Sequence, residues 1–388
     1  MLTNSEIGQR IRRAREEGGV PRARLAEALG VDESIISQLE DGTLDPLPGD
    51  YVLIAARALT KDFRSFISTD LDEIEEQTQR VYRALTEPSP ADLLAVRRFI
   101  AMCTVEHDLE VSLAVEMRPL PPTYPPVQLA HKKHVEHAVH AAQEERARLK
   151  LGNRPIGNVF DVLRSQGCRV FRHALENSAL SGLTVMHPQA GVSILVNYYD
   201  DMYRQFFSAA HEYAHVLFDR LEIQGRGCVV SYKFSRQELI EIRANRFASH
   251  FLLPPSALDR YSRPQNVQEL LEVIRQVALD YRVNTETVAR QMSDAGWMTD
   301  RTFRSFREKK PTRIGRGEKH DPDMPPNITE TQRQRRENII RAGVSQPLLE
   351  LLRRALIDGH ITFGRFAEIL DLTVSEANDF VRLSGIAL

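Results

Sequence analysis

A proline-rich stretch divides the chain into parts that must fold separately. Residues 117–127 read MRPLPPTYPPV and include five prolines. Proline fixes φ and lacks a backbone N–H, so this stretch can form neither a helix nor a central strand and should act as a semi-stiff spacer. Before it, apolar residues follow a helical period, whereas the first strand patterns appear after it, at 168–172, 183–187 and 192–197.

The chain is also too long, at 388 residues, for one compact domain of the usual size. The predicted fold class is multidomain and mainly α, with all-α regions at both ends and an α+β domain between them. Between Arg301 and His320, eight basic residues face two acidic ones, which indicates a solvated linker or, alternatively, a surface for DNA backbone or an acidic partner. The expected order is an all-α domain at 1–70, a helical connecting region at 71–117, a proline-rich linker at 118–127, the α+β domain with a helical tail at 128–300, a basic flexible linker at 301–328 and a helical carboxy-terminal region at 329–388.

The overall composition excludes several classes of protein. With 51 basic and 53 acidic residues the formal charge is −2, so no global field draws the chain to nucleic acid or to a membrane. The three cysteines, Cys103, Cys168 and Cys228, form no disulfide framework. Neither a signal peptide nor an apolar run of about 18 residues is present. We expect a cytoplasmic protein with no membrane partner.

The amino-terminal residues have the spacing of a helix-turn-helix. Residues 7–15, 22–29 and 32–39 each follow a helical period, and a Gly-Val pair supplies a tight turn before the third helix. The spacing therefore predicts three helices, of which the second and third are joined by the tight turn.

The segments IGQRIRRAREE, ARLAEALGVDESIISQLEDG and VLIAARAL resemble the XRE (Cro/cI-like) DNA-binding family over about residues 5–60. The resemblance implies that the helix at 33–39 enters the major groove of an operator and that Arg22 and Arg24 touch phosphate. Three polar side chains on that helix are candidates for contact with base edges: Ser34, Ser37 and Gln38.

The charge of this module opposes tight DNA binding. Residues 1–60 contain seven arginines, no lysine and ten acidic residues. Since phosphate neutralisation supplies most non-specific affinity, a single copy should bind DNA weakly, and a homodimer is expected if DNA is bound. The alternative is a helical module used for protein contact or dimerisation.

A weak internal repeat has the shape of two helices joined by a tight turn. Ala26, Leu29, Val31 and Ile36 recur in spacing as Ala278, Tyr281, Val283 and Val288, and as Ala367, Leu370, Leu372 and Ala377. Any helix pair needs a small residue where its helices cross, so the repeat by itself assigns no function.

The residues HEYAH at 211–215 have the spacing of a metal site. On a helix, His211 and His215 lie one turn apart on the same face, while Glu212 is rotated by about 100° and can reach a metal-bound water from the side. A catalytic zinc site needs a third protein ligand and an open fourth position. Downstream, Glu241 and Asn245 lie four residues apart, so the first can bind zinc while the second holds a ligand imidazole from behind.

HEYAH, followed by ExxANxFAxxxLLP and preceded by LSGLTV and ILVN, resembles the ImmA/IrrE-type metallopeptidases, a zincin group, over about residues 128–260. The resemblance implies a zincin-like domain in which His211, His215 and Glu241 hold Zn²⁺ and Glu212 is the general base. His250 stands where the family often has an acidic residue and is a candidate for contact with the transition state, the alternative being an ordinary surface or outer histidine. Four residues are left open as stabilisers of the oxyanion: Tyr198, Tyr199, Tyr232 and Arg243.

Taken together, the two resemblances imply a zinc-dependent endopeptidase that cleaves a protein substrate, a transcriptional repressor or similar regulator. In this interpretation zinc activates a water, Glu212 takes its proton, and the strand at 192–197 pairs with the extended substrate. The alternative is a non-proteolytic DNA-binding regulator or antitoxin-like protein that uses its zinc domain to sense a ligand or partner.

Overall fold

The computed structural model describes residues 2–59, 61, 63–67, 89–116, 119–124, 131–176, 179–187, 189–221, 223, 228–232, 239–312 and 314–383. The chain forms two compact units. The first joins Met1–Glu116 to Ile328–Leu388, and the second is Met117–Asn327. Parts of the expected connecting region and of the proline-rich linker lie outside the described residues.

The amino-terminal part of the first unit consists of short helices around a small apolar core. The helices are α1 (Asn4–Glu17), α2 (Arg22–Leu29), α3 (Glu33–Asp41), α4 (Gly49–Ala58) and α5 (Arg64–Ile67). Thr3 and Glu6 form a reciprocal capping box that starts α1. Ile11, Leu25 and Ile36, each fully buried, bring the first three helices together. The predicted helix-turn-helix arrangement is therefore present.

The remainder of the first unit combines one helix from the first half of the chain with four from its end. They are α7 (Pro90–Ser112), α16 (Glu330–Arg341), α17 (Gln346–Ile357), α18 (Phe363–Ile369) and α19 (Val374–Leu383). Arg98 of α7 donates to the carbonyl of Ala342 at 2.7 Å and pairs with Asp371 at 3.2 Å. The carboxy-terminal helices thus share a compact unit with α7 instead of forming a region of their own.

A four-stranded sheet forms the centre of the second unit. Its strands are β1 (Arg169–His173), β2 (Leu180–His187), β3 (Gly191–Asn197) and β4 (Cys228–Tyr232), in the order β1-β3-β2-β4. β1 pairs with β3 in parallel, and the other pairings are antiparallel. Both edges of β3 are therefore hydrogen-bonded within the sheet. The expectation that the strand at 192–197 pairs with substrate is wrong for this reason.

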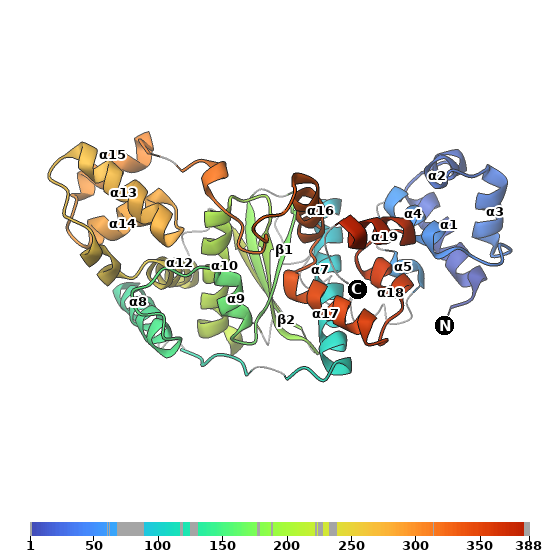
Figure 1. The fold of residues 1–388 in the computed structure, drawn as a ribbon, viewed down its shortest axis with the longest axis horizontal. Helices are drawn as coiled ribbons and strands as arrows, with labels where there is room; N and C mark the ends of the chain where they lie inside the picture. Colours follow the sequence, from blue (N-terminus) through green and yellow to red (C-terminus); the bar gives the residue numbers. More distant parts are fainter. Residues whose placement is uncertain are drawn as a thin grey trace. The chain divides into compact units, whose positions relative to one another are not determined.

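Helices cover the sheet in successive layers (Figure 1). They are α8 (His131–Arg148), α9 (Val159–Arg164), α10 (Met202–Phe218), α12 (Leu239–Leu252) and the 3₁₀ turn η1 (Pro255–Arg260). α10 contacts β2 and β3 on one side and α12 on the other, and α12 packs against α8. Phe206, Tyr213 and Phe247, all almost fully buried, fill the space between these layers. α10 is consequently enclosed between the sheet and α12.

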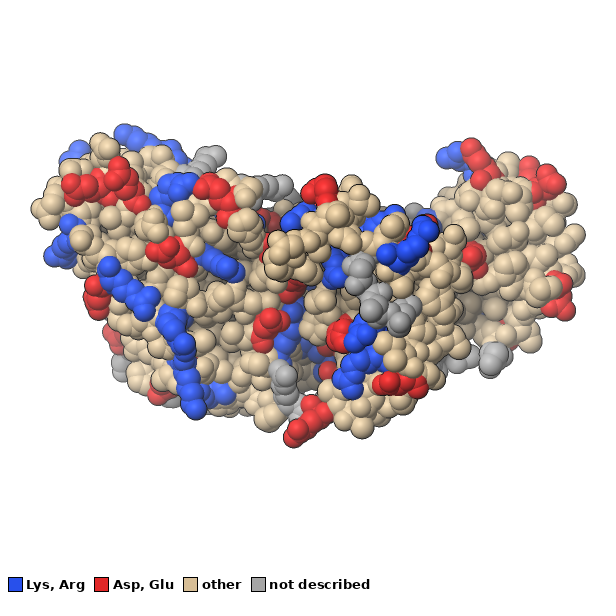
Figure 2. All heavy atoms as spheres, in the orientation of Figure 1, with Lys and Arg blue, Asp and Glu red and all other residues tan. Residues whose placement is uncertain are grey.

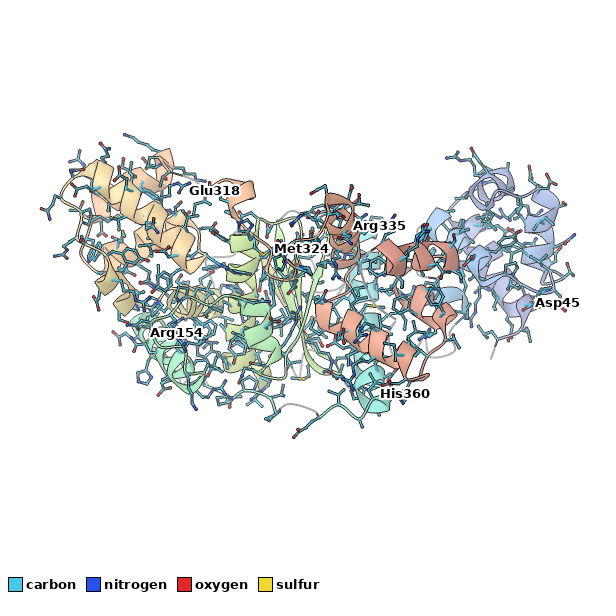
Figure 3. The ribbon with its side chains drawn as sticks, viewed as in Figure 1. Asp45, Arg154, Glu318, Met324, Arg335 and His360 are labelled. Carbon is cyan, nitrogen blue, oxygen red and sulfur yellow. The ribbon has the colours of Figure 1, made fainter. Side chains whose placement is uncertain are left out.

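The end of the second unit contains helical segments within the range 301–328, where the sequence indicated a basic linker. It contains α13 (Val267–Tyr281), α14 (Thr285–Asp294), α15 (Asp300–Lys309) and η2 (Arg316–Glu318). Asp321 and Asp323 pair at 2.8 and 3.0 Å with Arg172, which is 2% exposed. Met324, also buried, lies beside the sheet in Figure 3. The composition of this segment indicated solvent exposure, because Arg172, the buried partner of its two aspartates, is distant in the sequence.

Three helix pairs share one turn geometry. The turn residues Gly30, Arg282 and Asp371 have φ values of 65°, 54° and 59°. In each pair the next N–H donates to the carbonyl of the small residue at the crossing, as in Val31 to Ala26 at 3.1 Å, Val283 to Ala278 at 3.1 Å and Leu372 to Ala367 at 2.9 Å. The repeat in the sequence is thus a repeat of this left-handed turn, in α2–α3, α13–α14 and α18–α19.

The fold class predicted from the sequence, multidomain and mainly α with an α+β domain, is confirmed. In the ranges that the structure describes, every helix is too short or too polar to cross a bilayer.

Candidate metal centre and cleft

Helix α10 presents His211, Glu212 and His215 within the interior of the second unit. Asp201 begins the helix by accepting hydrogen bonds from the backbone N–H groups of Tyr203 and Arg204. His211 is 6% exposed, and Glu212 and His215 are fully buried. Buried polar groups of this kind require partners, and the neighbouring helix α12 supplies one.

Glu241 of α12 faces the two imidazoles. Its Oε2 lies 3.3 Å from His211 Nε2, its Oε1 lies 3.4 Å from His215 Nε2, and the two Nε2 atoms lie 3.2 Å apart. The donor atoms of the three residues all lie within 4.8 Å of one another. The hydrogen bonds and charges of the two histidines lower the pKa of Glu241 to about 2, although burial acts in the opposite direction. Glu241 is therefore ionised at neutral pH.

This donor set fits a divalent metal ion. Two imidazole nitrogens and one carboxylate form one of the usual three-ligand sets of catalytic zinc sites. Among the described residues, His211, His215 and Glu241 form the one group of three or more such side chains close enough to share an ion. The Nε2 atoms of His211 and His215 lie 3.2 Å apart, an arrangement that is readily explained if both bind a common cation.

Each imidazole is held from behind by a different residue. Asn245 Oδ1 lies 3.2 Å from His211 Nδ1, as the spacing on α12 predicted. Asp219 Oδ2 lies 2.8 Å from His215 Nδ1, and Arg243 donates to the other oxygen of Asp219. Sequence reasoning missed Asp219, although it follows His215 by four residues on the same helical face. Both contacts leave Nε2 as the metal-facing atom.

The carboxylate of Glu212 has one restrained oxygen and one available oxygen. Thr184 Oγ1 of β2 donates to Oε2 at 2.7 Å, whereas Oε1 is buried without a hydrogen-bond partner. Burial raises the pKa of Glu212, and the charges of His215 and His211 lower it by less. A Cβ at Gly182 would lie 2.4 Å from Oε1, so glycine is required there to make room for the carboxylate. The motif LSGLTV contained this glycine and threonine, but the sequence did not assign them a role.

A cleft of about 480 Å³ opens beside the metal-ligand cluster. Its wall includes His211 of α10 and Asn245 of α12, so the cleft reaches the candidate metal centre. The rest of the wall comes from α8, β2, α10, α12, α14 and α15 and consists of Val135, Ser181, Arg204, Phe207, Ser208, Ile242, Arg246, Ser249, Asn284, Glu286, Thr287, Arg290, Phe303 and Arg307. The ligand cluster is thus closed on the side of the sheet and accessible from the cleft.

Comparison with known families gives two matches. Residues 163–293 match the family model of the IrrE N-terminal-like domain, a peptidase family, and this range includes the whole ligand cluster. Residues 6–60 match the model of a helix-turn-helix domain. The chain thus carries a region similar to the IrrE N-terminal-like domain after a region similar to a helix-turn-helix domain. No curated protein matches the chain. The fusion predicted from the two resemblances is confirmed.

Within the IrrE-like domain, His250 does not join the cluster. It follows Glu241 by nine residues on α12, a rotation of about 180° to the opposite helical face. Its Nδ1 lies 2.9 Å from the carbonyl of Arg246, and burial lowers its pKa. The position of His250 therefore does not support the predicted contact with the transition state.

The candidates for stabilising the oxyanion are not brought to one point either. Arg243 is directed at Asp219, and the Tyr199 side chain is 55% exposed. Tyr198 lies with its ring 5.7 Å from the guanidinium of Arg172, on the β1 side of the sheet. The Tyr232 side chain lies outside the described residues. Arg243 instead contacts Asp219, which in turn contacts His215.

In the helix-turn-helix domain, the two predicted phosphate contacts differ in their availability. Arg22 donates through Nε to Glu40 at 2.8 Å, and the buried Glu40 also pairs with Arg15. Arg24 is exposed and forms a surface pair with Glu27 at 3.0 Å. Surface pairs of this kind contribute little and are readily exchanged. Arg24 is therefore the freer of the two arginines for a phosphate.

The candidate base-contacting residues lie on the outer side of α3. Ser34 and Gln38 are exposed, and Ser37 is half-buried with its hydroxyl donating to the carbonyl of Glu33. The face of the amino-terminal helices drawn in Figure 2 shows more acidic than basic groups. The second unit shows both signs interspersed on the same view.

Proposed function

We propose that the protein is a zinc-dependent endopeptidase with a DNA-binding module. The observation that carries the proposal is the cluster of His211, His215 and Glu241, whose donor atoms lie within 4.8 Å of one another beside an open cleft. The match to a peptidase family over the same residues supports it. His211, His215 and Glu241 would hold the ion, which would lower the pKa of its water and polarise the scissile carbonyl.

Glu212 is the proposed general base. Thr184 fixes Oε2 and leaves the unpartnered Oε1 to take the proton of the attacking water. The raised pKa of this buried carboxyl helps it to hold the proton and return it to the leaving amine. Asn245 and Asp219 keep the imidazoles oriented while this happens.

An extended peptide is the proposed form of the substrate. In the described part of the sheet, β4 pairs only with β2 and so has an edge that can accept another strand. β2 in turn carries Gly182 and Thr184 against the carboxylate of Glu212. We infer that the physiological substrate is a transcriptional repressor or a similar regulator, because the peptidase is fused to a helix-turn-helix domain.

Two substitutions test the proposal together. Glu212→Gln should abolish hydrolysis of a denatured protein substrate yet retain about one zinc ion per chain, because only the base is removed. Glu241→Ala should lose both hydrolysis and zinc, because it removes a ligand. Zinc is measured by elemental analysis and hydrolysis by mass spectrometry. Equal zinc content in Glu241→Ala and wild type would refute the ligand assignment, and undiminished hydrolysis by Glu212→Gln would refute the base.

The second candidate function is a non-proteolytic transcriptional regulator whose metal domain senses a ligand or partner. The helix-turn-helix match at residues 6–60 favours it, since that domain needs no peptidase to bind an operator as a dimer. If Glu212→Gln leaves regulation in cells unchanged while the metal stays bound, this candidate would be favoured over the peptidase.

A further inference from the structure

The cleft beside the metal centre carries a surplus of positive charge. Arg246 of α12, Arg290 of α14 and Arg307 of α15 all line it. Two carboxylates neutralise two of the three: Asp294 accepts from Arg246 at 2.5 Å and Glu286 pairs with Arg307 at 3.0 Å. Within this group, one guanidinium is left without a carboxylate of its own.

Arg290 is the residue that holds this surplus charge. Its guanidinium lies over the ring of Phe303, with Cζ 4.3 Å from the ring centroid. The residue remains exposed to the cleft, and in the described part of the chain it makes neither an ion pair nor a hydrogen bond to a carboxylate. Partial burial lowers its pKa, and the nearby carboxylates of Asp294 and Glu286, which pair with Arg246 and Arg307, oppose this shift only in part. The aromatic ring orients the guanidinium and leaves its edge open.

The repeated turn explains why α14 faces the cleft with this side chain. Counted from the left-handed turn residues Gly30 and Arg282, Arg290 has the same register as Gln38 of α3. In α3 the corresponding face is exposed to solvent. In α14 this face forms part of the cleft wall, which Asn284, Glu286 and Thr287 line together with Arg290. The second helix pair thus supplies side chains to the peptidase cleft.

We propose that the cleft contains a subsite for an acidic side chain of the peptide substrate and that Arg290 binds its carboxylate. The inference rests on the proposed peptidase function, because it names the preference of that same cleft. A planar guanidinium can hold a carboxylate through two parallel N–H···O bonds, which neutral side chains cannot reproduce. The occupant is an Asp or Glu side chain in an extended peptide whose scissile bond lies at the metal centre.

The test uses peptide capture, which does not depend on turnover. The full chain carrying Glu212→Gln is loaded with zinc, immobilised and exposed to a library of random decapeptides, and the bound peptides are sequenced by mass spectrometry. Asp and Glu should be enriched about tenfold over Asn and Gln at one position, as expected for about 1.4 kcal/mol. Adding Arg290→Gln should remove this enrichment, and Arg290→Lys, which keeps the charge without the planar group, should retain part of it.

A charge-matched control is available on the neighbouring helix. Arg301 is exposed on α15 and does not line the cleft, so Arg301→Gln in the same background should leave the enrichment unchanged. Enrichment that is absent from the Glu212→Gln protein, or that persists after Arg290→Gln, would overturn the inference. Loss of captured peptides to an excess of duplex DNA would also overturn it, because the cleft would then be a polyanion site. Specific capture without hydrolysis by the wild-type chain would leave the subsite standing and defeat the peptidase proposal.

Discussion

Asp219 fixes the imidazole of His215 from the side opposite to the metal position. Its Oδ2 lies 2.8 Å from His215 Nδ1, and Arg243 holds its other oxygen. A carboxylate behind a ligand imidazole selects the tautomer and raises the basicity of the metal-facing nitrogen. Thr184 restrains Glu212 by donating to its Oε2, a hydrogen bond that on its own lowers the pKa of this carboxyl, against the larger effect of burial. At the scale of residues, the site therefore depends on partners outside the HEYAH motif itself.

Replacing Asp219 by Asn should weaken zinc binding without removing a ligand. The neutral amide can still accept from Nδ1 but no longer pairs with Arg243, so we expect zinc affinity to fall about 10-fold to 100-fold. The affinity is measured by competition with a chelating dye. Asp259→Asn, at an exposed position, is the control and should bind zinc as the wild type does. Unchanged affinity in Asp219→Asn would show that this carboxylate does not tune the site.

At the scale of elements, the sequence predicted those parts whose signal is local. Helices α10 and α12 follow from apolar periodicity, and the spacing of His211, His215, Glu241 and Asn245 placed all four on facing helices. The order of the strands could not be predicted, because β4 joins the sheet beside β2 although β3 and α10 intervene in the chain. The contacts of residues 301–328 could not be predicted for the same reason, since Asp321 and Asp323 lie 149 and 151 residues from their partner Arg172.

The segment that contains Asp321 and Asp323 should contribute to the stability of the second unit. Asp323 is 7% exposed, pairs with Arg172 and lies 3.5 Å from Arg164. Asp323→Ala leaves buried positive charge incompletely paired, so the free energy of unfolding should fall by about 3 kcal/mol. Urea denaturation followed by circular dichroism measures it.

The control for Asp323→Ala is Glu308→Ala in the same segment. Glu308 is exposed, and its replacement should change the free energy of unfolding by less than about 0.5 kcal/mol. If the two variants proved equally stable, the ion pairs of Asp321 and Asp323 with Arg172 would not contribute as their burial indicates.

At the scale of the whole molecule, the region matching the helix-turn-helix model and the region matching the IrrE N-terminal-like model lie in different compact units. The metal site and its cleft are built entirely from the second unit. Changes at the candidate DNA contacts should therefore leave zinc binding unaffected, and changes at the candidate metal ligands should leave the fold of the first unit intact.

DNA binding should be dimeric and strongly salt-sensitive. Of the two arginines, Arg24 should act through its contact with DNA alone, whereas Arg22 should also affect the stability of the domain. Arg24→Ala should weaken operator binding and reduce the salt slope by about 1 per module without changing thermal stability, because its present partner is an exposed glutamate. Arg22→Ala should also lower the melting temperature, since it removes a partner of the buried Glu40. Fluorescence anisotropy against the upstream region of the gene, at low and physiological salt, measures the first effect. Tight monomeric binding indifferent to Arg24→Ala would place the DNA-contacting surface elsewhere.

The assembly of the first unit from two distant stretches of chain also sets an order of events during synthesis. Residues 117–327 are synthesised before α16, α17 and α18, so much of the second unit can fold while α7 still lacks α17. The face of α7 that packs against α17 must therefore wait for residues 346–357 before it is covered. A chain released early would carry a folded second unit together with a helix that lacks this partner, a combination that exposes it to chaperones and to quality-control proteolysis.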